Sequence, residues 1–209
     1  MKKLLITGFE PFGGEVQNPS WDAVALLPDQ IAEYALCKLR LPVVFGEAPQ
    51  RAILAAEKEK PDAILCVGQA GGKNAVTPEL VGINLMHAAI PDNGGNQPLD
   101  EPILPGGSAA YFSTLPVRRM TAAIAEAGIP AKLSYSAGTY VCNNVLYSLL
   151  AHYSGSHTRV GFIHVPFVPE QAKNQAPSLP LGDMVTALTT AIRAMEDGDV
   201  RFPNPPAEK

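Results

Sequence analysis

The sequence predicts an α/β protein, a three-layer α/β/α sandwich in which helices cover both faces of a mostly parallel, twisted sheet. Short apolar runs alternate along the chain with stretches of helical periodicity. The runs are continuously apolar, which is typical of parallel strands buried on both faces. The 209 residues, 46% apolar and 17% charged, suit one hydrophobic core. We therefore predict a single domain over residues 1–200 and a Pro-rich tail over residues 201–209.

The apolar runs predict the strands in chain order. They fall at residues 2–7, 34–42, 62–67, 132–135 and 159–165. Residues 76–85 are also β-like and indicate a further strand or a hairpin arm. Residues 91–107 are rich in Pro, Gly, Asn and Asp, so we expect a long irregular loop, a kind of segment that is often functional.

Capping signals predict the helices between these strands. Asn18 followed by Pro19 is an N-cap with Pro at the first helical position, and Gly128 and Gly198 are typical helix stops. The helices are expected at residues 21–27, 49–60, 116–127, 142–153 and 181–197.

Charge and cysteine content exclude several classes of function. Sixteen Lys and Arg against 20 Asp and Glu leave no cationic surplus for nucleic acid. The opening residues MKKLLITGFEPFGG carry too few apolar residues for a signal peptide or a membrane span. Three cysteines without a CxxC pair exclude a disulfide framework and a Cys-rich zinc site. We therefore expect a cytoplasmic protein without nucleic-acid or membrane partners.

Two glycine-containing loops follow predicted strands, where ligands bind in parallel α/β sheets. Neither loop has the spacing of a phosphate-binding motif, which disfavours a nucleotide ligand. In the first loop Phe9 and Phe12 either face a flat apolar ligand or pack on the core. In the second loop Gln69 either reads a neutral amide of a ligand or braces its own loop.

Cys142 is the candidate nucleophile because it stands at the start of a predicted helix. There the unpaired N–H groups and the helix dipole favour a thiolate and can also hold an oxyanion. Cys66 lies within an apolar strand and Cys37 alternates with leucines, so both are expected to be buried or structural.

The candidate base for Cys142 is a histidine. His152 lies ten residues further along the helix, about 15 Å away, and cannot reach the thiol. His157 lies in a Ser-Gly loop without a reason to be fixed. His164 ends a strand at the expected sheet edge and is the better candidate, while His87 precedes the irregular loop and can also approach.

A carboxylate completes such a site by orienting the imidazole and stabilising its charged form. Glu79 and Asp92 are both eligible from their places in the chain, and the pattern does not choose between them.

Several long motifs give the sequence a resemblance to a known family. GFEPFGG, Asn18-Pro19-Ser20, GQAGG, TPE, IPDN, SAGTYVCN and IHVPF occur here in that order. From residue 4 to about residue 195 the chain resembles the pyroglutamyl peptidase I family, also called pyrrolidone-carboxylate peptidases. The resemblance implies a phosphorylase/hydrolase-like sandwich, a homotetramer, and no metal or cofactor.

The resemblance also implies roles for individual residues. Cys142 would be the nucleophile, His164 the general acid and base, and Glu79 the group that orients His164. The substrate would be a small peptide with an N-terminal pyroglutamyl residue, which the enzyme removes through a thioester. The implied substrate-binding residues are Phe9, Phe12, Asn18, Gln69 and Val141.

The chain departs from the family pattern at a few positions near these motifs. Lys73 stands where the family has Arg in GGR, Ala89 where it has Arg in ARIPDN, and His87 where an acidic residue is common. Leu80-Val81-Gly82 also replaces the usual basic-Val-Ala run. The Ala89 departure favours an alternative, a catalytically weakened homologue that binds pyroglutamate or a cyclic amide. A nucleoside phosphorylase is a third hypothesis, which draws only on the fold-level analogy and the glycine loops.

Overall fold

A six-stranded sheet with the strand order β2-β3-β1-β4-β8-β5 forms the centre of the structure, a computed structural model that describes residues 1–196. Four strands run parallel: β3 (Tyr34–Leu41), β1 (Lys2–Phe9), β4 (Ala63–Gln69) and β8 (Arg159–Val165). The two edge strands, β2 (Gln30–Ile31) and β5 (Thr77–Glu79), run antiparallel to their neighbours. A separate antiparallel pair joins β6 (Val81–Ile83) and β7 (Ala110–Phe112).

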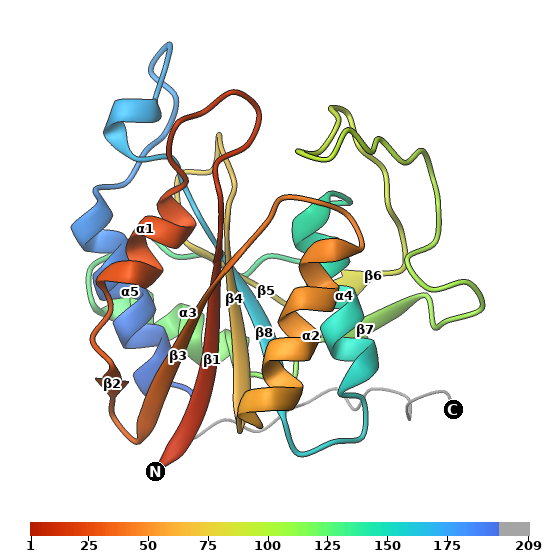
Figure 1. The fold of residues 1–209 in the computed structure, drawn as a ribbon. Coiled ribbons are helices and arrows are strands. Elements are labelled where there is room, and N and C mark those ends of the chain that lie inside the picture. The colour runs from red at the N-terminus through yellow and green to blue at the C-terminus, as the bar shows by residue number, and fades with distance from the viewer. Residues whose placement is uncertain (197–209) are drawn as a thin grey trace.

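Helices cover both faces of this sheet (Figure 1). One face carries α1 (Pro19–Leu26), α3 (Val117–Glu126) and α5 (Leu181–Arg193), and the other carries α2 (Glu47–Glu59) and α4 (Val141–His152). Side chains along each strand alternate between the two layers, so Leu4 and Ile6 join one core cluster and Leu5 joins the other. The predicted three-layer sandwich is therefore confirmed, and burial on both faces explains the continuous apolar runs.

The regular elements follow the predictions closely. Strands are confirmed at the first three predicted positions and at residues 159–165. The Asn18 side chain caps α1 by accepting a hydrogen bond from the Ser20 N–H at 3.1 Å, with Pro19 at the first helical position. Gly128, with φ +82°, follows the end of α3 as predicted. A short 3₁₀ turn (Pro169–Gln171) follows β8.

The strand predicted at residues 132–135 is wrong. The segment forms only isolated parallel bridges, Val76 with Ala131 and Glu79 with Ser134. The N–H groups of Val76 and Leu80 bond to the carbonyls of Pro130 and Ser134. In a regular parallel ladder every second residue of this segment would donate its N–H, and the residue between Val76 and Leu80 in that series is Pro78. Proline has no N–H to donate, so the ladder is interrupted at its middle.

The predictions missed the shortest elements and some boundaries. β2 and β7 have two and three residues, too few to give a periodic signal. The β-like residues 76–85 are split into β5 and β6, and residues 91–107 are irregular as expected. Helix α5 ends at Arg193, whereas its predicted end at residue 197, Gly198 and the predicted tail lie outside the described residues.

Close packing between β1 and α1 gives a first prediction about stability. A Cβ on Gly8 would lie 2.6 Å from the Trp21 Cα, so Gly8→Ala must displace the helix backbone. We expect the free energy of unfolding to fall by about 1–3 kcal/mol, measured by denaturant titration. Gly182→Ala in α5 is the matched control, because nothing lies within 4 Å of the added Cβ. That variant should be neutral or stabilised by up to about 1 kcal/mol, and equal losses in both variants would contradict the prediction.

Candidate active site

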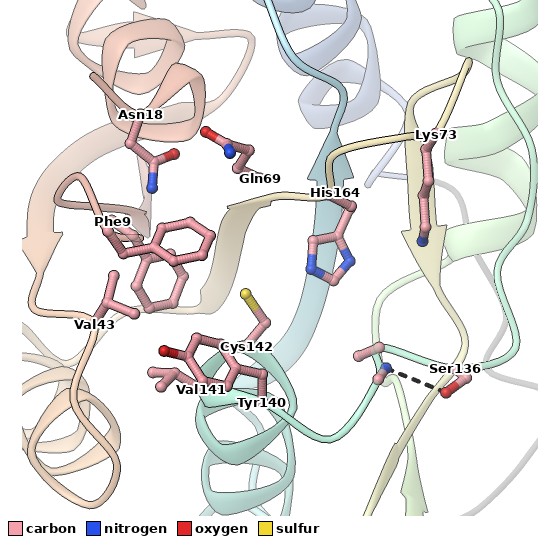
Figure 2. Close-up of a pocket in the computed structure, with 14 residues that line it drawn as sticks. Phe9, Asn18, Val43, Gln69, Lys73, Ser136, Tyr140, Val141, Cys142 and His164 are labelled. Carbon is pink, nitrogen blue, oxygen red and sulfur yellow. Dashed lines mark hydrogen bonds between the residues drawn. The ribbon is translucent and has the colours of Figure 1, made fainter. Parts of the chain in front are cut away.

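A cavity of about 330 Å³ opens at the carboxyl ends of the central strands, beside the start of α4 (Figure 2). This is the edge where ligands bind in parallel α/β sheets. The lining residues come from the ends of β1, β4 and β8, from the loops after β1, β3 and β4, from the N-cap of α1 and from the segment that enters α4. They are Phe9, Phe12, Asn18, Val43, Gln69, Ala70, Lys73, Ser136, Ala137, Gly138, Tyr140, Val141, Cys142 and His164.

Cys142 lies in the first turn of α4 and its sulfur points toward the middle of the cavity (Figure 2). The N-cap residue, Tyr140, makes no side-chain cap to the helix N–H groups. The sulfur packs closely on β4, where a Cβ on Gly68 would lie 2.8 Å from it. Glycine is therefore required at position 68 for the thiol to sit against the strand.

The expectation that the helix start lowers the pKa of the Cys142 thiol is wrong for the free protein. Burial raises this pKa to about 12, and the charge of Glu79 adds to the effect. The Lys73 ammonium and the backbone N–H of Cys142 itself act in the predicted direction, but they are outweighed. The thiol is therefore protonated near neutral pH, and another group must take its proton before it can attack.

His164 and Glu79 form a buried pair next to the thiol. His164 ends β8, and the antiparallel pairing of β5 with β8 places Glu79 on the same side of the sheet. Glu79 Oε1 lies 2.8 Å from His164 Nδ1, and the two residues are 0% and 5% exposed. Because Nδ1 faces the carboxylate, Nε2 is the nitrogen left for the cavity. One ring nitrogen faces the side of Cys142 (Figure 2).

The ionisation of Glu79 is set by opposing effects. Burial by itself raises the pKa of this carboxyl group. The hydrogen bond and charge of His164, a contribution from Ser134 and the charge of Lys73 outweigh burial, so the pKa lies below its ordinary value. Glu79 is therefore a carboxylate that accepts the Nδ1–H of His164, the arrangement that fixes an imidazole tautomer.

Asp92, the other candidate carboxylate, has hydrogen-bond partners of its own. Asp92 accepts hydrogen bonds from the N–H groups of Phe45, Gly94 and Asn96 and so braces the irregular loop. The structure therefore brings Glu79, and not Asp92, to His164.

The remaining histidines also lie away from the cavity. His87 Nδ1 lies 2.9 Å from Asp100 Oδ1 on the surface, His152 Nε2 lies 3.5 Å from Glu57 Oε1, and His157 is exposed. Of the other cysteines, Cys66 is buried as predicted and Cys37 is partly buried in β3.

The apolar side of the cavity contains the predicted aromatic residues. Phe9 lines the cavity and also packs on the core, with its ring centroid 6.4 Å from that of Phe162, so both alternatives hold for it. Phe12 packs against Tyr140 at 6.1 Å between ring centroids. Val141, from the start of α4, and Val43 complete this apolar wall.

Two amide side chains give this side its polar groups. Asn18 Nδ2 donates to the Glu10 carbonyl at 2.9 Å, while its oxygen caps α1. One Nδ2 hydrogen remains, and the amide nitrogen is directed toward the cavity (Figure 2). Gln69 accepts a hydrogen bond from Gln171 at 3.4 Å, so this amide is braced and lines the cavity at once.

Sequence reasoning missed part of the site. Lys73 appeared only as a departure from GGR, yet its Nζ donates to Glu79 Oε1 at 3.2 Å and to Thr77 Oγ1 at 3.1 Å. The spacing of Lys73, Thr77 and Glu79 was the available signal. Val43 and Tyr140 carried none, because they reach the cavity only through the fold. Ala89, by contrast, is exposed and is not among the lining residues.

Within residues 1–196, no group of three or more His, Cys, Asp and Glu could hold a metal ion. The same residues include no helix that is both long and apolar enough to cross a membrane.

This arrangement defines a cysteine-dependent hydrolase. It combines a cysteine at a helix start, a histidine at the end of a strand beside it, and a buried carboxylate hydrogen-bonded to that histidine, all within an α/β sandwich. Comparison with known proteins gives the particular family. The model of the pyroglutamyl peptidase family matches residues 2–197. The chain belongs to this family.

Individual relatives agree with this assignment. The chain is 50% identical to a pyrrolidone-carboxylate peptidase of Bacillus subtilis over 208 residues, 97% of each chain. It is 49% identical to that of Staphylococcus carnosus over 199 residues, 93% of each. The crystal structure of pyroglutamyl peptidase I from Bacillus amyloliquefaciens superposes with TM-score 0.91 at 46% identity, covering 96% of this chain and 99% of that one. The pyrrolidone carboxyl peptidase of Thermococcus litoralis gives TM-score 0.91 at 36% identity, covering 97% and 100%.

The high pKa of the Cys142 thiol gives a prediction for the resting protein. The measurement is the ultraviolet absorbance of thiolate in the wild type and in Cys142→Ser. The difference between the two should be near zero at neutral pH, because burial keeps the Cys142 thiol protonated. The signal should appear only in strongly alkaline solution. Cys37→Ser, which leaves the cavity unchanged, is the control. A full thiolate signal at neutral pH that is lost in Cys142→Ser would show a preformed thiolate and contradict this account.

Proposed function

We propose that this protein is a cysteine exopeptidase, an omega-peptidase, that removes N-terminal pyroglutamyl residues from small peptides through a thioester intermediate. The observation that carries the proposal is the Cys142, His164 and Glu79 arrangement beside a cavity walled mainly by apolar side chains. The names of the relatives support the same substrate.

The chemistry of the pyroglutamyl group suits this cavity. The group is a flat lactam ring with no charge and no free amine, so it needs apolar surfaces and one neutral polar contact. Phe9, Phe12 and Val141 provide the apolar surfaces, and Gln69 provides an amide that can both donate to and accept from the lactam. Asn18 adds its remaining amide hydrogen. A prolyl ring lacks the lactam carbonyl and would leave these amides unpaired.

The first half of the proposed reaction forms the acyl-enzyme. His164 Nε2 takes the proton of the Cys142 thiol as sulfur attacks the carbonyl that joins pyroglutamate to the next residue. Glu79 stabilises the imidazolium that forms. Backbone N–H groups at the start of α4 hold the oxyanion. The C–N bond then breaks, His164 protonates the leaving amine, and the shortened peptide departs.

The second half hydrolyses the thioester. His164 takes a proton from water, the hydroxide attacks the same carbonyl, and the C–S bond breaks with return of the proton to sulfur. Pyroglutamate is released and the protonated thiol is regenerated. The proposed cycle uses these three side chains, the backbone N–H groups at the start of α4, and water.

The assembly and location of the protein are also proposals. A homo-oligomer, a homotetramer by family resemblance, and a cytoplasmic location accord with the family pattern. The three free cysteines of the described structure support a reducing compartment. Residues 1–200 are proposed to form one domain.

The proposed activity is tested by hydrolysis of a fluorogenic pyroglutamyl amide, with the matching prolyl amide as the control for the lactam carbonyl. We expect turnover of the pyroglutamyl amide only, and loss of that turnover in Cys142→Ser, because the hydroxyl is a far weaker nucleophile here. Retained binding without turnover in a folded wild type would favour the binding homologue instead.

Recognition of the lactam by Gln69 gives a separate prediction. Gln69→Met keeps the length of the side chain but removes the amide, so the lactam would be buried without its partner. We expect kcat/KM for the pyroglutamyl amide to fall about tenfold to hundredfold, equivalent to about 1.4–2.8 kcal/mol. Gln50→Met, on the exposed side of α2, is the matched control. Unchanged kcat/KM in Gln69→Met would leave Gln69 only the role of bracing its loop.

A further inference from the structure

Lys73 makes contacts that the proposed reaction does not use. It lies in the loop between β4 and β5, and its side chain is 33% exposed. Its Nζ donates to Glu79 Oε1 at 3.2 Å and to Thr77 Oγ1 at 3.1 Å, and Thr77 Oγ1 lies 3.4 Å from the same carboxylate oxygen. In Figure 2 the Lys73 side chain lies on the side of His164 opposite Cys142.

The Glu79 carboxylate needs a permanent counter-charge. Its side chain is fully buried, and its second oxygen, Oε2, has no hydrogen-bond partner among residues 1–196. A buried carboxylate that is not compensated takes up a proton instead of staying charged. Neutral His164 stabilises the Glu79 carboxylate through one N–H, but it brings a compensating charge only when it is itself protonated. The Lys73 ammonium is present in both protonation states of the imidazole.

We propose that Lys73 is a positioning residue that keeps Glu79 ionised and directs its Oε1 to His164 Nδ1, so that Nε2 faces Cys142. The inference rests on the proposed triad and adds a fourth side chain to it. Lys73 touches neither sulfur nor the reacting carbonyl in this account, and it acts through the carboxylate.

The sign of the pH effect follows from the groups around Glu79. Lys73 faces it from the β4–β5 loop, His164 from β8, Thr77 from its own strand and Ser134 from the adjoining segment. Cys142 faces it from α4, with the Cys66 thiol behind. Removing the one permanent cation of this set stabilises an added proton on the Glu79 and His164 pair. The pair must lose that proton before it can accept one from the thiol.

The test compares the pH profiles of Lys73→Met, Lys73→Arg and wild type on the pyroglutamyl amide. In Lys73→Met the acidic limb of the kcat/KM profile should move up by about one pH unit. Near neutral pH, kcat should fall about tenfold while KM changes little. Lys73→Arg, which keeps the charge, should return the limb to its wild-type position. Lys3→Met removes a more exposed ion pair, with Glu59, at the far end of the sheet and is the control for loss of a lysine away from the cavity.

Two outcomes overturn the proposal. A profile of Lys73→Met that superimposes on wild type would show that Glu79 needs no counter-charge. An equal loss at every pH, not rescued by Lys73→Arg, would give Lys73 only a structural role. Thermal unfolding of each variant shows whether the cavity is still formed.

A second readout separates this proposal from the triad itself. The alkylation rate of Cys142 by iodoacetamide, followed by mass spectrometry, needs no turnover and should show the same pH shift in Lys73→Met. If His164→Gln leaves alkylation and hydrolysis unchanged, the triad is wrong and Lys73 cannot act through it. If His164→Gln slows both but Lys73→Met has no effect on either, the triad stands and the role of Lys73 is refuted.

Discussion

The hydrogen bond between Glu79 Oε1 and His164 Nδ1 is the interaction on which the site depends. It joins the edge strand β5 to the parallel strand β8, which ends beside Cys142, so the imidazole is held both by its own strand and by Glu79. A buried carboxylate is costly unless it is paired, and this pairing is possible only because β5 runs antiparallel to β8 and ends with Glu79. The pair is itself shielded from solvent, because Glu79 and His164 are both buried.

Much of the fold could be predicted because its signals are local. Continuous apolar runs mark strands that are buried on both faces, and Asn18 with Pro19 marks a helix start within two residues. The segment at residues 132–135 was misjudged because its pairing depends on Pro78, more than 50 residues earlier, which cannot donate to the ladder. Local pattern carries no information about such a partner. β2 and β7 are too short for any period to show.

Only part of the candidate site could be predicted from the sequence. Cys142 and His164 follow from a helix start and a strand end, and both positions were readable from the chain. The choice of Glu79 over Asp92 depends on which strand pairs with β8, a tertiary fact that the motif resemblance supplied and spacing did not. The protonated state of the thiol was also out of reach, because desolvation is decided by packing from β4 and overrides the helix start.

The balance of charges around the cavity connects the site to its proposed substrate. In the resting state the Lys73 ammonium offsets the Glu79 carboxylate, and the Cys142 thiol is neutral. The cavity therefore presents almost no net charge to a ligand, which matches a pyroglutamyl ring that carries none. In the proposed reaction charge develops only after the substrate binds, as an oxyanion at the start of α4 and an imidazolium against Glu79, where fixed partners already lie. A free amino terminus would bring its cation to the apolar wall formed by Phe9 and Phe12, where no counter-charge lines the cavity. On the proposed function, the apolar wall would therefore disfavour peptides with a free amino terminus, whose charge it would desolvate without a partner.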